Sequence, residues 1–144
     1  MPTKKFDPRP KAIVSDIDGT ITAEPHSTGP NKPVPQMIRL LWNFKRKGYA
    51  IVLLTAREEK KRQMTLYWLR RYRVPFDMLL MRPNEDQEQP WLYKLHSFRE
   101  FIEPVYDVHA ALDDKVNCWR LLGIRRPNLH RIRSLGGNAY QYMS

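Results

Sequence analysis

The chain has almost no cysteine and no long hydrophobic run, and both absences exclude whole classes of protein. Cys118 is the only cysteine among the 144 residues, which excludes an internal disulfide and a zinc site built from cysteines. No apolar stretch approaches the roughly 18 residues of a membrane helix, and residues 1–9 are too polar for a signal peptide. We therefore expect a cytoplasmic protein with no membrane partner, in which Cys118 is a small core residue.

Internal repeats and linkers are also missing. The 144 residues fit one domain, and a hydrophobic content of 42% is enough for a core. We therefore expect a single domain over residues 1–144, with residues 1–10 and about 134–144 as loosely held termini.

Positive charge is present in excess. The chain has 25 lysines and arginines against 15 acidic residues, a formal net charge of +10. This excess favours an anionic partner, and nucleic acid is the commonest partner of that kind.

Apolar periodicity alternates between strand-like and helix-like segments, which is typical of a parallel α/β sheet. The predicted strands are residues 12–15, 49–55, 78–81, 105–112 and 129–132. The predicted helices run from about Met37 to Gly48, over 58–73, over 91–102, and over a short segment that closes at Gly123. We expect about five parallel strands with helices on both faces.

Polar side chains collect where the predicted strands end. These residues are Asp16-Ile17-Asp18-Gly19-Thr20, Thr55-Ala56-Arg57 and Asp113-Asp114, and Lys94 lies near the start of the helix before the fourth strand. Ligands of such sheets bind at the carboxyl ends of the strands, where these residues would meet. Clustered carboxylates repel one another unless a hard cation lies among them, so we expect Mg²⁺.

Each of these side chains alone has a simpler explanation. Lys94 alone suits a solvated helix, Asp113-Asp114 a helix N-cap, and Thr55 an ordinary strand. Their combination, in this order and at these element ends, favours phosphoryl-transfer chemistry.

The same residues resemble the four motifs of the haloacid dehalogenase (HAD) superfamily, and the likeness covers nearly the whole chain. It implies a Rossmann-like HAD fold and an Asp16 nucleophile that attacks a phosphate monoester to give an aspartyl-phosphate. It also implies that Asp18 protonates the leaving oxygen and later deprotonates the attacking water, that Gly19 allows a sharp turn, and that Thr20 braces this turn.

The remaining motif residues receive ligand-binding roles from this resemblance. Mg²⁺ would be held by Asp16, by the backbone carbonyl of Asp18, and by one or both of Asp113 and Asp114. Lys94 and the hydroxyl of Thr55 would bind the transferring phosphate oxygens. Residues 21–54 and 56–93 leave no room for a cap domain, so we expect a capless enzyme with an open site that suits a bulky substrate.

Two stretches resemble the 3'-phosphatase domain of phage-type polynucleotide kinase-phosphatases more specifically. They are GYAIVLLTARE and YKLHSFREFIEPVYDVHAALDD, followed by WRLLGI. This resemblance implies that Arg57 is needed for activity and pairs with Asp113, and that substrate is bound by Thr55, Ala56, Arg57 and Lys94. That family usually has an arginine in the flap after DxDGT that helps to hold substrate, whereas the only candidate cation in this flap is His26. The family also tends to have an aspartate shortly before the lysine that matches Lys94, and this chain lacks one there.

The predicted helix after Arg57 is rich in cations and aromatic side chains. These residues are Lys60, Lys61, Arg62, Arg70 and Arg73, together with Tyr67 and Trp68. We expect them either to follow a phosphodiester backbone, with an aromatic ring stacked on a base, or to form a solvated helix face over core aromatics.

The leading hypothesis is a Mg²⁺-dependent phosphatase that removes terminal phosphate from nucleic acid, with the 3'-phosphate as the expected target. One alternative is a capless phosphatase for nucleotides or other small phosphate esters, and another is a nucleic-acid-binding module on an inactive HAD scaffold. No GxxxxGK[ST] loop is present, so we expect any kinase or ligase partner to be a separate polypeptide.

Overall fold

The fold is built around a central sheet, and the computed structural model describes residues 6–24, 31–114, 130–131 and 140–143. In this part of the chain the sheet has six strands in the order β3-β2-β1-β4-β6-β5. The strands are β1 (Lys11–Ser15), β2 (Ala50–Glu58), β3 (Met78–Arg82), β4 (Asp107–Asp113), β5 (His130–Arg131) and β6 (Tyr140–Met143). The first four pair in parallel, and β6 pairs antiparallel with β4 and β5.

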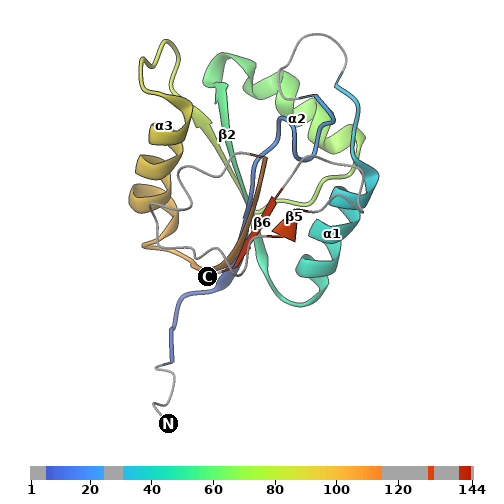
Figure 1. Ribbon diagram of the computed structural model, residues 1–144, viewed down its shortest axis with the longest axis vertical. Helices are drawn as coiled ribbons and strands as arrows, with labels where there is room; N and C mark the ends of the chain where they lie inside the picture. The colour runs from blue at the N-terminus through green and yellow to red at the C-terminus, as the bar shows by residue number, and fades with distance from the viewer. Residues whose placement is uncertain (1–5, 25–30, 115–129, 132–139, 144) are drawn as a thin grey trace.

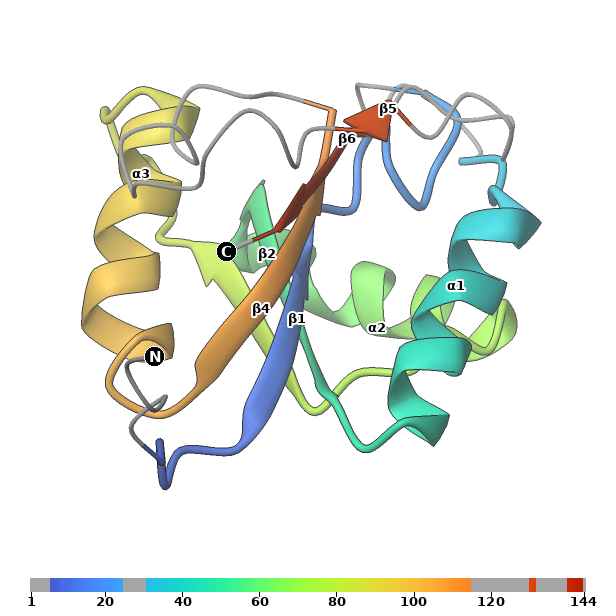
Figure 2. The same ribbon diagram turned by 60° about the horizontal axis from the view of Figure 1, so that its bottom comes forward.

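Helices cover both faces of this sheet. They are α1 (Pro35–Arg46), a 3₁₀ turn (Glu59–Lys61) that leads into α2 (Arg62–Arg71), and α3 (Pro90–Ser97), which continues as a π-helical turn (Phe98–Ile102). Figure 1 shows α1 and α2 on one side of the strands and α3 on the other, and Figure 2 shows β1 and β4 side by side between these layers. The arrangement is an α/β fold, as predicted, with two antiparallel strands added to the parallel part.

Alternating side chains of β1 divide the core into two clusters, because successive residues of a strand point to opposite faces. Ile13 packs in the cluster under α1 and α2 with Leu41 and Leu69. Ala12 and Val14 pack in the smaller cluster under α3. The sheet is therefore held from both sides, which is the setting that parallel strands require.

The chain reverses sharply after α1. Gly48 has a φ of +92°, a left-handed conformation that glycine adopts without strain, so the predicted end of this helix is confirmed. No cap domain is inserted between the described elements: the only pairing seen between β1 and α1 is a bridge of Thr22 with Pro33. Within the described residues, no helix has the length and apolar character needed to cross a membrane.

Several boundaries differ from the prediction. β2 does not end at Thr55 but continues to Glu58, because a register shift lets Glu58 pair with Arg82 at the end of β3. The helix predicted over 58–73 is shorter for this reason. Residues 134–144 were expected to be a loosely held terminus, and of these Tyr140–Met143 form β6. Cys118, the helix closing at Gly123, residues 1–5 and residues 132–139 lie outside the described part.

Candidate active site

Three carboxylates meet at the carboxyl ends of β1 and β4. Asp16 directly follows β1, and its backbone N–H donates to the carbonyl of Leu112 at 2.8 Å, which ties the end of β1 to β4. Asp113 ends β4 and Asp114 follows it. Carboxylate oxygens of Asp16, Asp113 and Asp114 lie within 4.8 Å of one another. The neighbouring strands thus bring together residues that are almost a hundred positions apart.

Lys94 reaches this group from α3, which covers the face of the sheet opposite to α1 and α2 (Figure 1). Its Nζ lies 2.9 Å from Oδ1 of Asp16 and 2.9 Å from Oδ2 of Asp113. The side chains of Lys94 and Asp113 are only 7% and 1% exposed. One ammonium group therefore bridges the carboxylates of two strands in a site largely closed to water.

Burial and mutual repulsion control protonation in this group. Burial raises the pKa of Asp16 well above its usual range; the ammonium of Lys94 opposes this effect, and the carboxylates of Asp113 and Asp114 add to it. Burial, together with the charge of Asp113, also raises the pKa of Asp114. Burial alone would lower the pKa of Lys94, but Asp113 and Asp16 raise it above its ordinary value.

The charge balance of this group fits a divalent cation. Three carboxylates face a single ammonium, and desolvation makes the remaining negative charge costly. Carboxylate oxygens are the ligands that Mg²⁺ and Ca²⁺ prefer. Asp16, Asp113 and Asp114 are thus the residues that would hold such an ion. The carboxylate of Asp18 lies elsewhere, and its backbone carbonyl stays a predicted ligand.

The second carboxylate of the DxDGT motif is held by an arginine. Arg57 donates from Nε to Oδ2 of Asp18 at 2.9 Å and from Nη2 to Oδ1 at 2.7 Å. The predicted pairing of Arg57 with Asp113 is therefore wrong. The continuation of β2 past Thr55 places Arg57 next to β1, whose following turn carries Asp18, while Lys94 occupies the side of Asp113.

A residue of α2 holds this arginine in turn. The third nitrogen of the guanidinium, Nη1, donates to Oγ1 of Thr65 at 3.2 Å, and Thr65 is fully buried. Thr65 was not among the site residues predicted from the sequence. Its signal was a polar residue on the apolar face of the helix, because Thr65 precedes the buried Trp68 and Leu69 by three and four positions.

The turn after Asp18 is built as expected at Gly19 and differently at Thr20. Gly19 has a φ of +76°. Its N–H donates to Oγ1 of Thr22, and that hydroxyl donates to the carbonyl of Glu24 at 2.9 Å. Thr22 therefore braces the turn, whereas the hydroxyl of Thr20 is buried without a partner among the described residues.

Thr55 and Ala56 lie within β2, between the two polar groups. The hydroxyl oxygen of the buried Thr55 accepts a hydrogen bond from the backbone N–H of Arg57 at 3.1 Å, which leaves the hydroxyl proton available to another acceptor. Ala56 is partly buried against the cluster under α3. Their predicted contacts with substrate stay predictions.

Some of the cations and aromatic residues after Arg57 are engaged within the protein, and others are exposed to solvent. Trp68 belongs to the core, where its Nε1 donates to the carbonyl of Asn31 at 3.0 Å. Arg62 is engaged with Glu59 at 2.7 Å. Tyr67, by contrast, is 68% exposed. His26 of the flap lies outside the described residues.

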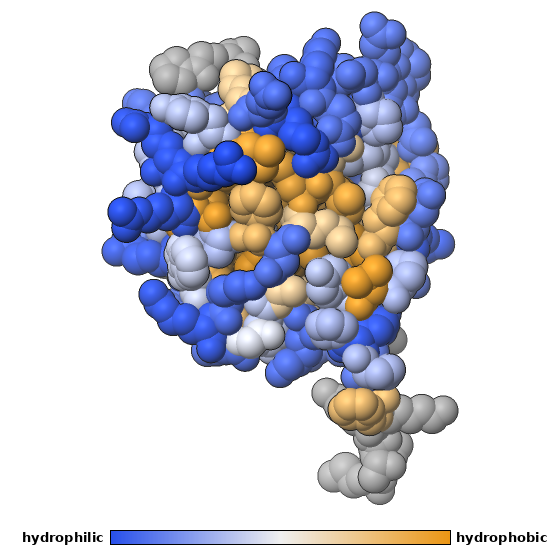
Figure 3. All heavy atoms as spheres, turned by 180° about the vertical axis from the view of Figure 1, so that it is seen from behind, coloured by the Kyte–Doolittle hydropathy of each residue, from blue (hydrophilic) through white to orange (hydrophobic). Residues whose placement is uncertain are grey.

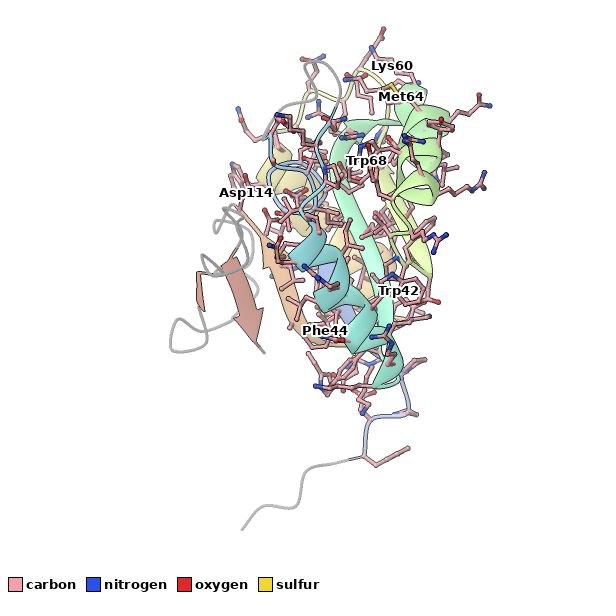
Figure 4. The ribbon with its side chains drawn as sticks, turned by 90° about the vertical axis from the view of Figure 1, so that its right-hand side faces the viewer. Trp42, Phe44, Lys60, Met64, Trp68 and Asp114 are labelled. Atoms are coloured by element: carbon pink, nitrogen blue, oxygen red, sulfur yellow. The ribbon has the colours of Figure 1, made fainter. Side chains whose placement is uncertain are left out.

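Figure 4 shows Asp114, Lys60 and Met64 toward the upper end of the molecule, and Trp42 and Phe44 toward the lower end. The upper end carries the carboxyl ends of the parallel strands. A buried carboxylate suited to nucleophilic attack, a group that fits a hard cation, and a second carboxylate fixed by a guanidinium are therefore gathered at this end. Together they are suited to displacement at an anionic phosphorus centre.

Comparison with protein families gives one match over most of the chain. Residues 10–128 match the family described as the polynucleotide kinase PNKP phosphatase domain. A protein of Autographa californica nuclear polyhedrosis virus, named as a candidate bifunctional polynucleotide kinase/RNA ligase, is 30% identical over 136 residues. The alignment covers 82% of this chain and 19% of the viral protein.

Solved structures give the same picture. Chains from structures described as the Pnkp1/Rnl/Hen1 RNA repair complex and the Pnkp1/Rnl/Hen1 complex superpose with TM-scores of 0.75 and 0.75, at 29% and 27% identity. The matches cover 82% and 83% of this chain, but only 41% and 44% of those chains. The chain thus spans less than half the length of each of these relatives.

Proposed function

Because the chain belongs to the family of PNKP phosphatase domains, within the haloacid dehalogenase superfamily, we propose that it removes 3'-phosphate from the ends of nucleic acid. The observation that carries this proposal is the buried group of Asp16, Asp113 and Asp114 around Lys94 at the carboxyl ends of parallel strands. The names of the viral relative and of one solved complex refer to RNA, which favours RNA as the substrate.

Asp16 acts as the nucleophile. Its carboxylate attacks the phosphorus, the bond from phosphorus to the ribose oxygen breaks, and an aspartyl-phosphate forms. Asp18 gives its proton to the departing ribose oxygen. It then takes a proton from the water that attacks the same phosphorus, which frees Asp16 and releases inorganic phosphate.

The surrounding side chains support these two steps. Lys94 lies against Asp16, so its ammonium is placed to balance the charge that develops on the phosphate oxygens, and the Thr55 hydroxyl donates to the same oxygens. Arg57 orients Asp18 through two hydrogen bonds. A Mg²⁺ ion held by Asp16, Asp113 and Asp114, and by the carbonyl of Asp18, would supply positive charge that lets two anions approach.

The net charge of +10 supports a nucleic-acid substrate, because a phosphodiester backbone is the extended anion that such a surface attracts. We assign only the phosphatase step to this stretch of sequence, since it contains no phosphate-binding loop for a kinase. The longer relatives suggest that kinase and ligase steps reside on other sequence that acts with it.

Phosphate release from matched oligonucleotides tests the proposal. RNA carrying a 3'-phosphate or a 5'-phosphate, the corresponding mononucleotides and the DNA counterparts are compared with Mg²⁺ and with EDTA, using Asp16→Asn as the control. We expect Mg²⁺-dependent release from the 3'-phosphorylated RNA. Turnover of mononucleotides alone would replace this function with that of a small-ester phosphatase, and RNA binding without any turnover would leave a binding module.

A further inference from the structure

The outer face of α2 begins beside the candidate active site. Only Glu58 separates Arg57, which holds Asp18, from the 3₁₀ turn, and α2 follows that turn. Figure 4 shows Lys60 and Met64 at the top of the molecule, where α2 begins, whereas Trp68 lies lower, toward the core. A strand bound at the active site would therefore meet the start of α2 first.

Six exposed residues lie along this face, and we call them the α2 stripe: Lys60, Gln63, Met64, Tyr67, Arg70 and Arg71. They recur three and four positions apart, which aligns them on one side of a helix over about 16 Å. The stripe contains three cations and no acid. Tyr67 lies at its centre and is 68% exposed, and Met64 one turn earlier is 55% exposed.

Another concave surface of the molecule has the opposite charge. A pocket between the end of β3 and α3 is lined by Glu59, Asp86, Glu88 and Glu100, beside apolar residues. Glu59 and Glu88 contact Arg62 and His96, so the repulsion of phosphate groups comes mainly from Asp86 and Glu100. Figure 3 looks onto the side of the molecule that carries β3 and α2, and shows apolar side chains in the middle with hydrophilic ones around them.

We propose that the α2 stripe binds the single-stranded part of the nucleic acid, upstream of the phosphate that enters the active site. Tyr67 stacks on a base, while Lys60 and Arg70 contact backbone phosphates on either side of it. Stacking is possible because the ring is exposed, and it does not depend on base identity. This assignment rests on the proposed nucleic-acid substrate and specifies where the strand runs.

Binding of a fluorescent, 3'-phosphorylated single-stranded RNA to Asp16→Asn protein tests the stripe directly. Added to that background, Tyr67→Ala should weaken binding about tenfold, and Tyr67→Phe should retain it because the ring is kept. Phe101→Ala is the matched control, since Phe101 is an aromatic residue that is 49% exposed beside the acidic pocket, and it should leave the affinity unchanged.

Salt dependence tests the two cations. Lys60→Gln with Arg70→Gln should reduce the slope of log affinity against log salt by about 1.4, the value for two phosphate contacts on a single strand. Arg46→Gln with Lys47→Gln removes the same charge at the end of α1, away from the strands' carboxyl ends, and should leave the slope unchanged.

The outcomes separate the stripe from the proposed function. Equal RNA affinity with and without Tyr67, or equal slopes for the two charge-pair variants, would overturn the stripe and favour a protein occupant for Met64 and Tyr67. Wild-type protein that binds this RNA without releasing phosphate would overturn the proposed function alone.

Discussion

The two polar groups at the carboxyl ends of the strands differ in their balance of carboxylates and cations. Around Lys94, the carboxylates of Asp16, Asp113 and Asp114 outnumber the single ammonium. Between Asp18 and Arg57 one carboxylate meets one guanidinium, and all three guanidinium nitrogens have partners. The excess negative charge of the first group favours a bound cation, whereas the charges of the second group balance within the protein.

Exposure separates the two groups as well. Asp113 and Lys94 are almost entirely buried, but the side chain of Asp18 is 18% exposed. A partly open carboxylate can exchange a proton with substrate and water, and a buried group can hold an ion and a nucleophile away from water. The comparison therefore predicts that changes in the Lys94 group affect both stability and chemistry, and that changes in the Arg57 group affect mainly chemistry.

The largest effect is expected from Asp16→Asn, which removes the nucleophile from the Lys94 group. The amide cannot form an aspartyl-phosphate, so phosphate release should fall at least about 10⁴-fold. Circular dichroism should show an unchanged fold. Residual release well above this level would mean that another group attacks the phosphorus.

Lys94→Met tests the buried ion pairs. It leaves carboxylates without their ammonium, so the free energy of unfolding in urea should fall by about 3–5 kcal/mol and activity by about 10²- to 10³-fold. Arg57→Met should cost less stability, because the Asp18 that it exposes is closer to water. Equal losses of stability in both variants would remove the distinction between the groups.

Mg²⁺ should stabilise only the group that lacks positive charge. At about 100 times its dissociation constant, Mg²⁺ should raise the free energy of unfolding by about 2.7 kcal/mol. Asp113→Asn should largely lose this effect. Asp18→Asn should keep it, since the backbone carbonyl is retained; thermal unfolding with and without Mg²⁺ compares the variants, and the opposite pattern would place the ion beside Asp18.

The smallest effect is expected at Thr65, which touches Arg57 and not the substrate. Thr65→Val keeps the shape but removes the acceptor for Nη1, so kcat should fall about fivefold, in line with the loss of one hydrogen bond. Thr65→Ser restores the acceptor and should restore kcat, with little change in KM in either variant. A positioning role would be refuted if valine and serine gave equal kcat values.

Local patterns were enough to predict most of the fold. Short apolar runs rich in β-branched residues, such as residues 49–55, are typical of strands buried between two helical layers. The structure confirms four parallel strands at the predicted places. The convergence of Asp16, Lys94 and Asp113 was predicted as well. Parallel strands bring their carboxyl ends to one edge, so the order of the motifs along the chain was sufficient.

Hydrogen-bond and ion-pair partners that depend on the direction of a side chain were harder to predict. Arg57 was expected to meet Asp113 but binds Asp18, and Thr22 rather than Thr20 braces the turn. Trp68 and Tyr67 are neighbours in sequence, and only packing of α2 on the sheet decides which one is buried and which is exposed.

The α/β architecture, the family and the set of acidic and basic groups at the ends of the strands all follow from the amino-acid sequence alone. These depend on periodicity and residue type, which are local properties of the chain. Which carboxylate each cation binds depends on the folded chain, because a long side chain can reach several acids. That choice depends on strand register, such as the shift that extends β2 past Thr55, and on a contact from another helix, Thr65.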